Sequence, residues 1–511
     1  MRKACKVLAQ VAGRFLFIGI SVQIIFGIVW GIRSFGIFPE FGDSYLWLKA
    51  ARTLVCDDYM GIGYPLFLML AKGIESISSI PYTFFVYFVQ CVFAFVSGAV
   101  FLRSFGVIKK SWMLYWGSLG MLTFPMALQC HLAVLPNSIG FSCLLMELAA
   151  VIRILRLDGT SDSNDTDKAQ KDALQGRPLH MFFETAAWWV IGALFVVENR
   201  YLGLVPVVLL WIFHLIQRRK TGKTRILQEL VLLAAMGGIL FTLVSLWQTP
   251  GSYGKAENTI SAAMMRRFSW THMREGKEYE AWPEELREHL SWEEVKNAGY
   301  YAGTMSSGIQ KTIEDAVGKQ EAQKLFRKYA SYNLKTYASD NIHQIAWDCA
   351  GYALPPMLLQ LLLDGRGYDS FSGRNVDIYM TGSPRLVNIM LKYSSWWFLM
   401  GIPAMILSTL CCMFSSNSGK FREQNDEKIS GQNCRNMENK KGKRNVETIQ
   451  IFIICIVTAG CMILWYAMQD AGCFDYKNGL LPGCLWLVGM ILSVGKVLKE
   501  KELEETSEEK A

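Results

Sequence analysis

The sequence lacks several patterns that mark metal sites, disulfide frameworks and nucleotide-driven pumps. Its 13 cysteines form no CxxC pair and no zinc spacing, and several lie in or beside apolar runs, where cysteine behaves as a small hydrophobic residue. Its six histidines form no HExxH motif or other ligand pair at helical spacing. No Walker A motif occurs, which argues against an ATP-driven transporter.

Long apolar runs are, by contrast, abundant. The chain of 511 residues is 51% hydrophobic, and its apolar blocks are about 18 to 25 residues long, the length that a helix needs to cross a bilayer. We therefore expect an all-α polytopic membrane protein. The first block, Phe15 to Trp30, follows a basic start and has no small-residue cleavage site after it, which predicts an uncleaved span. The net charge is +8, and most of the excess Lys and Arg is expected in short cytoplasmic loops. Nucleic acid is therefore not an expected partner.

Ten segments are apolar enough to be expected as transmembrane spans. They are 14–33, 81–103, 112–131, 137–155, 184–198, 201–217, 226–248, 394–414, 449–468 and 480–497. The apolar run inside 60–76 is too short to cross, so an external re-entrant or surface helix is expected there. Most Lys and Arg of the short loops then fall on one side, together with both termini. The positive-inside rule makes that side cytoplasmic, and we expect a multi-pass protein of a bacterial cytoplasmic membrane.

The spans divide the chain into two membrane modules and an external domain. We expect an N-terminal module over 1–249, whose first external loop is 34–80, a helical external domain over 250–393, and a C-terminal module over 394–498. Within the last module the polar loop 415–448 is expected to be disordered, and 499–511 forms a cytoplasmic tail. In the external domain, AWPEELREHL has the proline and glutamates that favour a helix N-terminus.

Asp43 stands at the start of an amphipathic pattern in the first external loop. Trp47, Leu48, Ala51, Leu54 and Val55 share one helical face, and Lys49, Arg52 and Thr53 share the other. This predicts a helix on the membrane surface with Asp43 at its N-terminus. Asp43 is then a helix cap, for which aspartate is a preferred residue, or a reactive carboxylate at the bilayer edge.

Four segments resemble the start of membrane glycosyltransferases of the GT-C superfamily, and are most similar to its protein O-mannosyltransferase and aminoarabinose transferase branch. They are FGDSYLWLKAARTL, GIGYPLFLMLAKGI, FPMALQCHLAVLPNSIGFSCLLMELA and WWVIGALFVVENRYLGLVPVVLLW. The resemblance covers about residues 10–250 as pattern and topology. The chain departs from the pattern at Ser44 and Asn137, where the family has acidic residues.

The resemblance implies transfer of a sugar from a polyprenyl-phosphate donor to a glycan, lipid or protein acceptor outside the cytoplasmic membrane, with inversion at the anomeric carbon. Asp43 would be the general base, since an acceptor hydroxyl needs a carboxylate to take its proton, and partial desolvation raises the pKa of such a carboxylate. The departing lipid phosphate needs fixed cations or a metal. The candidate cations are Arg200, Arg266 and Arg267.

Each of the remaining candidates has an ordinary explanation beside the functional one. Arg200 is either a donor ligand or an interfacial anchor with Glu198 beside it, and Arg266 and Arg267 either bind phosphate or face headgroups and solvent. Asp57 and Asp58 either hold a divalent cation, Mg or Mn, together with Asp43 or form a turn. The expected acceptor or cavity residues are His131, Asn137, Tyr45 and Trp270, although polar and aromatic residues also gather at membrane surfaces without a ligand.

The alternative is an envelope-polysaccharide membrane protein of another kind, namely a polymerase, a flippase or an inactive relative of the glycosyltransferases. A transporter is expected to carry ionisable residues or broken helices near the middle of the membrane. Glu147 is the clear case in this sequence, whereas the other notable ionisable residues lie toward the expected outer edge. That distribution favours chemistry at the membrane surface.

Overall fold

The structure is a computed structural model that describes thirteen stretches of the chain. They are 2–34, 44–54, 60–108, 110–160, 168–196, 199–217, 223–247, 284–289, 313–336, 338–353, 396–411, 450–465 and 480–508, with residues 56, 291, 293 and 393 besides. These stretches are helices and their connections, and no β-strand occurs among them beyond one isolated bridge. The all-α prediction is confirmed for this part of the chain.

Five of the helices in the described stretches contain an apolar run long enough to cross a membrane. They are α1 (Arg2–Ser34), α4 (Tyr82–Ser104), α7 (Asn137–Thr160), α11 (Lys223–Trp247) and α23 (Leu480–Glu508). At 1.5 Å per residue, even an eighteen-residue apolar stretch covers about 27 Å, close to the thickness of a bilayer core. Such helices indicate an integral membrane protein.

Shorter apolar helices occupy most of the other predicted spans. They are the Leu179–Phe195 part of α8 (Lys168–Phe195), Asn199–Phe213 in α9 (Asn199–Leu202) and α10 (Leu204–Gln217), and the unlabelled helices Trp396–Cys411 and Gln450–Trp465. The predicted span 112–131 consists of two helices, α5 (Ser111–Leu122) and α6 (Pro125–His131). Pro125 lies in the first turn of α6 and has no N–H with which to continue α5. Ten complete spans therefore remain a prediction.

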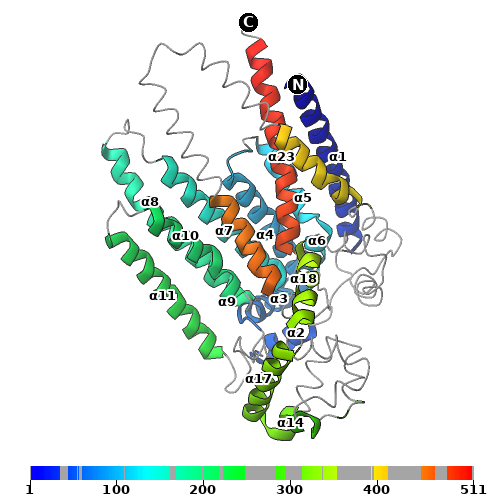
Figure 1. The fold of residues 1–511 in the computed structure, drawn as a ribbon, viewed down its shortest axis with the longest axis vertical. Helices are drawn as coiled ribbons and strands as arrows, with labels where there is room; N and C mark the ends of the chain where they lie inside the picture. The colour runs from blue at the N-terminus through cyan, green and yellow to red at the C-terminus, as the bar shows by residue number, and fades with distance from the viewer. Residues whose placement is uncertain are drawn as a thin grey trace.

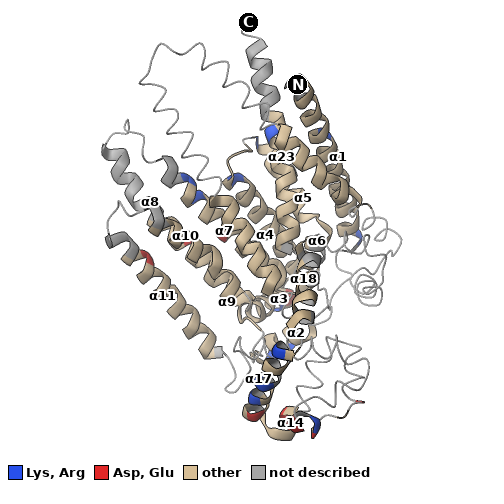
Figure 2. Ribbon diagram, viewed as in Figure 1, with Lys and Arg blue, Asp and Glu red and all other residues tan. Residues whose placement is uncertain are grey.

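Helix α7 lies at the centre of the bundle and contacts α4, α8 and α10 (Figure 1). Of its apolar stretch 89% is buried inside the protein, against 17% for that of α11, which packs on α8. Charged residues gather on the helices outside the bundle and toward the ends of the bundle helices (Figure 2). The apolar flank of α11 is consistent with contact with lipid.

Both chain termini lie at one end of the bundle, and α2 (Ser44–Thr53) and α3 (Gly63–Ser78) lie toward the other (Figure 1). Beyond α2 and α3 follow α14 (Glu284–Arg287) and α17 (Lys319–Thr336), and α18 (Ala338–Ala353) leads back to the bundle, where the indole N–H of Trp486 donates to the carbonyl of Ala353 (2.9 Å). The two segments expected outside the membrane thus share the end of the bundle that we call the loop end.

Candidate functional site

The first residue of α2 is attached to the connection between α6 and α7. The Ser44 hydroxyl donates a hydrogen bond to the carbonyl of Val134 (3.0 Å), and Ser44 is fully buried. The buried face of α2 then packs on α3, with the rings of Trp47 and Tyr64 in edge-to-face contact at 5.5 Å. The first turn of α2 is therefore held beside the start of α7.

Gln90 of α4 also contacts the connection between α6 and α7. Its Nε2 donates to the carbonyls of His131 and Ala133, both at 2.9 Å, while its Oε1 accepts the hydroxyl of Tyr64 at 3.1 Å. The carbonyl partners require the amino group on one side, and the phenol donor suits the carbonyl oxygen on the other. One buried amide thereby joins α3, α4 and the α6–α7 connection.

His131 closes this network at the end of α6. The side chain is 1% exposed, and its Nδ1 lies 2.7 Å from the hydroxyl of Ser138 in the first turn of α7. The structure therefore gives His131 an internal partner, and its expected role with an acceptor stays a prediction. Asn137, the neighbour of Ser138, is half-buried at the first position of α7.

The end of α8 and the short α9 complete the loop end. Met60 and Val196 form an antiparallel bridge, and the backbone of Gly61 lies so close to α8 that an added Cβ would stand 2.2 Å from the carbonyl oxygen of Leu194. The amide of Asn199 donates to the carbonyl of Gly140 (3.1 Å), which fixes α9 against α7. The bridge and the close approach at Gly61 join the end of α8 to the first loop, and the Asn199 bond joins α9 to α7.

Arg200 is the next residue of α9 and is half-buried. Its backbone carbonyl accepts the indole N–H of Trp189 at 3.3 Å. Because Asn199 anchors α9 to the first turns of α7, Arg200 lies in the same part of the molecule as Ser44, His131 and Asn137. An arginine guanidinium is a group that can bind a phosphate through paired hydrogen bonds.

The predicted site residues fall into two groups. Tyr45, His131, Asn137 and Arg200 are described, and all of them belong to elements of the loop end; Tyr45 itself is 60% exposed on α2. The predicted base Asp43, the predicted metal ligands Asp57 and Asp58, and Arg266, Arg267 and Trp270 lie outside the described residues. Among the residues that are described, no group of three or more His, Cys, Asp or Glu is arranged to hold a metal ion.

Three residues that organise the site are absent from the sequence-based candidates. They are Tyr64, Gln90 and Asn199. The position of Gln90 inside an apolar run could have identified it, because a buried amide there requires internal hydrogen-bond partners. Asn199 is likewise a polar neighbour of Arg200 at the end of a predicted span.

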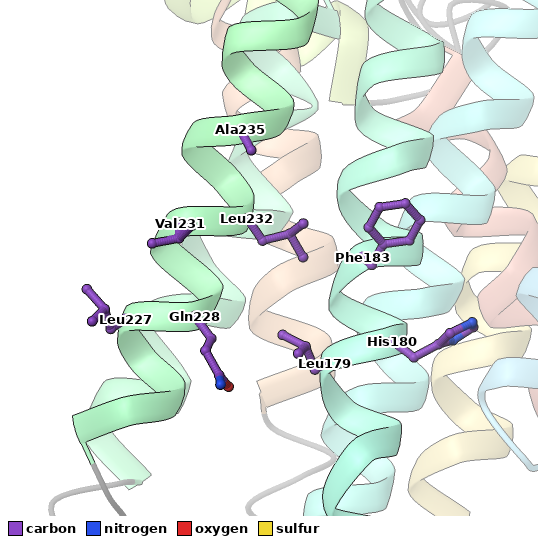
Figure 3. A pocket seen from close by; sticks show the side chains of 8 residues that line it. All are labelled: Leu179, His180, Phe183, Leu227, Gln228, Val231, Leu232 and Ala235. Carbon is purple, nitrogen blue, oxygen red and sulfur yellow. The ribbon is translucent and has the colours of Figure 1, made fainter.

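A concave feature lies away from the loop end, between α8 and α11 (Figure 3). It has a volume of about 710 Å³ and is lined by Leu179, His180, Phe183, Leu227, Gln228, Val231, Leu232 and Ala235. Leu232 extends toward α8 in this view. The largely hydrocarbon lining suits a lipid chain better than a sugar, and no predicted site residue lines the groove.

Comparison of the chain with protein-family models, with curated proteins and with solved structures finds no match.

Proposed function

We propose that the protein is an integral-membrane glycosyltransferase of the GT-C type. In this proposal it moves a sugar from a polyprenyl-phosphate donor to a glycan, lipid or protein acceptor on the outer side of a bacterial cytoplasmic membrane, with inversion. The loop end is the outer side, and both termini are cytoplasmic. Support for this orientation comes from the basic loops and from the common end at which the termini lie.

The observation that carries the proposal is the convergence of three elements at the loop end. Ser44 bonds to Val134, Asn199 bonds to Gly140, and Met60 bridges to Val196. The first turn of α2, which follows Asp43 directly in the sequence, therefore lies beside the start of α7, and α9, which contains Arg200, is attached to the same helix. A base and a phosphate ligand in one neighbourhood are what sugar transfer from a lipid phosphate requires.

In the proposed reaction, the Asp43 carboxylate accepts the proton of the acceptor hydroxyl while that oxygen bonds to the anomeric carbon. The bond between the anomeric carbon and the phosphate oxygen breaks, and the lipid phosphate leaves with the electron pair. Arg200, together with Arg266 and Arg267, stabilises the charge on the phosphate. A divalent cation at Asp57 and Asp58 would supply the same stabilisation.

The test is transfer of label from a panel of radiolabelled polyprenyl-phosphate sugars by the purified full-length protein in lipid nanodiscs. We expect Asp43→Asn to reduce transfer by about 100- to 10,000-fold, the usual contribution of a general base, with an unchanged melting temperature. Glu40→Gln is the matched control, since it removes the neighbouring carboxylate of the same loop and is expected to keep full transfer. Equal transfer by wild type and Asp43→Asn would overturn the assignment of the base.

A flippase for a polyprenyl-linked glycan is the second candidate, and one observation favours it. Glu147 is a buried carboxyl in the middle of α7, a position more typical of transport than of surface chemistry. Movement of a labelled lipid-linked sugar across liposomes containing the protein, without any transfer to an acceptor, would support this candidate and contradict the first.

A further inference from the structure

Glu147 is the most deeply placed carboxyl of α7. It is the eleventh residue of the helix and 2% exposed. Ten residues of helix correspond to about 15 Å, half the thickness of a bilayer core of about 30 Å. The carboxyl therefore lies midway along the most buried of the membrane-length helices, where an ionised group is costly unless it is paired.

The surroundings of the carboxyl offer no compensating charge among the described residues. Its Oε1 is buried and has no hydrogen-bond partner in this part of the chain. Its Oε2 lies against Gly203, where an added Cβ would stand 3.2 Å from that oxygen and 3.0 Å from the Cδ1 of Trp189. A titratable neighbour is the thiol of Cys143, one turn earlier on α7, which cannot neutralise a carboxylate.

Gly203 marks a discontinuity in the neighbouring helix. It separates α9 from α10, and Pro206 follows in the first turn of α10. A proline has no N–H, so Pro206 cannot supply the hydrogen bond that the carbonyl of Leu202 would accept in a continuous helix. Glu147 thus lies next to Gly203, the residue after a carbonyl that lacks its regular helical donor.

We propose that Glu147 is a proton-binding site inside the membrane, and that its carboxylic acid donates a hydrogen bond at the α9–α10 junction. The bound proton neutralises the Glu147 carboxylate and also provides the O–H that donates the hydrogen bond. A metal ion fits less well, because no cluster of three His, Cys, Asp or Glu exists among the described residues. The inference does not depend on sugar transfer.

The location gives the proton a consequence for the loop end. Gly203 follows Arg200 by three residues, one helical turn, and α9 is attached to α7 through Asn199 and Gly140. Loss of the proton leaves a negative charge beside Gly203, directly after α9. It also removes the hydrogen-bond donor that the carboxylic acid provides at the α9–α10 junction. Protonation of Glu147 therefore positions the short helix that carries Arg200.

Infrared difference spectroscopy of the full-length protein in lipid at pH 7 tests the proposal. We expect Glu147→Gln to remove one carboxylic-acid carbonyl band from the wild-type spectrum, and we expect this band to shift after transfer to D2O because the proton exchanges. Loss of a carboxylate band instead would overturn the proposal. An acid band that does not shift in D2O would also overturn it, since the proton would then be a fixed structural one.

Glu184→Gln is the matched control. Glu184 forms an ion pair with Arg153 at 2.6 Å between α7 and α8, and its substitution should remove a carboxylate band. If Glu147→Gln does not fold, labelling of the wild-type protein with dicyclohexylcarbodiimide replaces it, because this apolar reagent adds to protonated carboxyls. We expect at least ten times more adduct at Glu147 than at Glu184 by peptide mass spectrometry, and equal or reversed labelling would contradict the proposal.

Discussion

The hydroxyl of Tyr64 donates a hydrogen bond of 3.1 Å to the Oε1 of Gln90, and this contact joins the first loop to a membrane-length helix. Burial, followed by the neighbouring phenols of Tyr87 and Tyr82, raises the pKa of Tyr64 well above its usual value. Tyr64 therefore remains a neutral donor at every pH at which the protein is handled. The contact between Tyr64 and Gln90 is accordingly a fixed support and does not titrate.

Gln90→Leu is expected to destabilise the fold because it leaves the Tyr64 hydroxyl and the carbonyls of His131 and Ala133 without their donor or acceptor. Gln23→Leu is the control, since Gln23 is equally buried but makes a single described hydrogen bond, to the carbonyl of Gly120. We expect Gln90→Leu to cost about 1–3 kcal/mol more than the control. Equilibrium unfolding in detergent measures the difference, and equal losses would show that the network adds nothing.

Gly61→Ala is expected to push α3 away from the end of α8. Its new Cβ would meet the carbonyl oxygen of Leu194 at 2.2 Å, a backbone atom that cannot turn aside. Overpacking of this kind costs about 1–3 kcal/mol. Gly73→Ala is the matched control in the same loop, because nothing lies within 4 Å of its added Cβ, and helix propensity predicts a gain of about 1 kcal/mol. Melting temperatures that move in the same direction for both variants would contradict the close approach at Gly61.

Arg200→Ala is expected to weaken binding of a polyprenyl phosphate by roughly 10- to 100-fold, the equivalent of one charged hydrogen bond of about 1.5–3 kcal/mol. Arg103→Ala controls for general loss of charge, because Arg103 is exposed in the last turn of α4, at the other end of that helix from the first loop. Titration with a fluorescent polyprenyl phosphate in nanodiscs provides the measurement. Unchanged affinity in the Arg200 variant would identify this residue as an interfacial anchor.

Acidification is expected to release α14 from α17. Lys328 forms a hydrogen bond and ion pair with Glu285, which lowers the pKa of that carboxyl. A lowered folded-state pKa means that the contact stabilises the docked state above the ordinary glutamate pKa, and that this contribution disappears as the pH falls through the lowered value. Hydrogen exchange of residues 284–289, corrected for intrinsic rates, should therefore rise only at a pH below the ordinary glutamate pKa. Glu285→Gln should show the higher exchange already at pH 7, while Glu321→Gln, which affects a pair inside α17, should not.

Helix periodicity predicted the parts of the fold that local pattern controls. Trp47, Leu48 and Ala51 are buried on α2 while Lys49 and Arg52 are exposed, as the amphipathic pattern predicts. The break before Pro125 was missed because a proline at that position fits either a kink within one span or the first turn of a new helix. The partners of Gln90 could not be predicted at all, because they depend on residues 26 and 41 positions away in the chain.

For the candidate site, the sequence predicted which segments meet but not how each side chain is used. Tyr45, Asn137 and Arg200 belong to converging elements, and this followed from the expected alternation of spans. The internal bond of His131 to Ser138 did not follow, because exposure at the end of a helix is decided by what packs over it. The catalytic assignment of Asp43 remains a prediction.

The bridge between Met60 and Val196 also has a consequence for biosynthesis. The first loop emerges from the ribosome long before its partners do. Val134, the partner of Ser44, is synthesised 90 residues later, and Val196, the partner of Met60, follows at the end of α8. At about 5–20 residues per second, α2 and α3 spend several seconds or more at the membrane surface before the helices that cover them have been inserted. During that interval, α1 tethers the two helices, and their own amphipathic character is all that favours their contact with the bilayer.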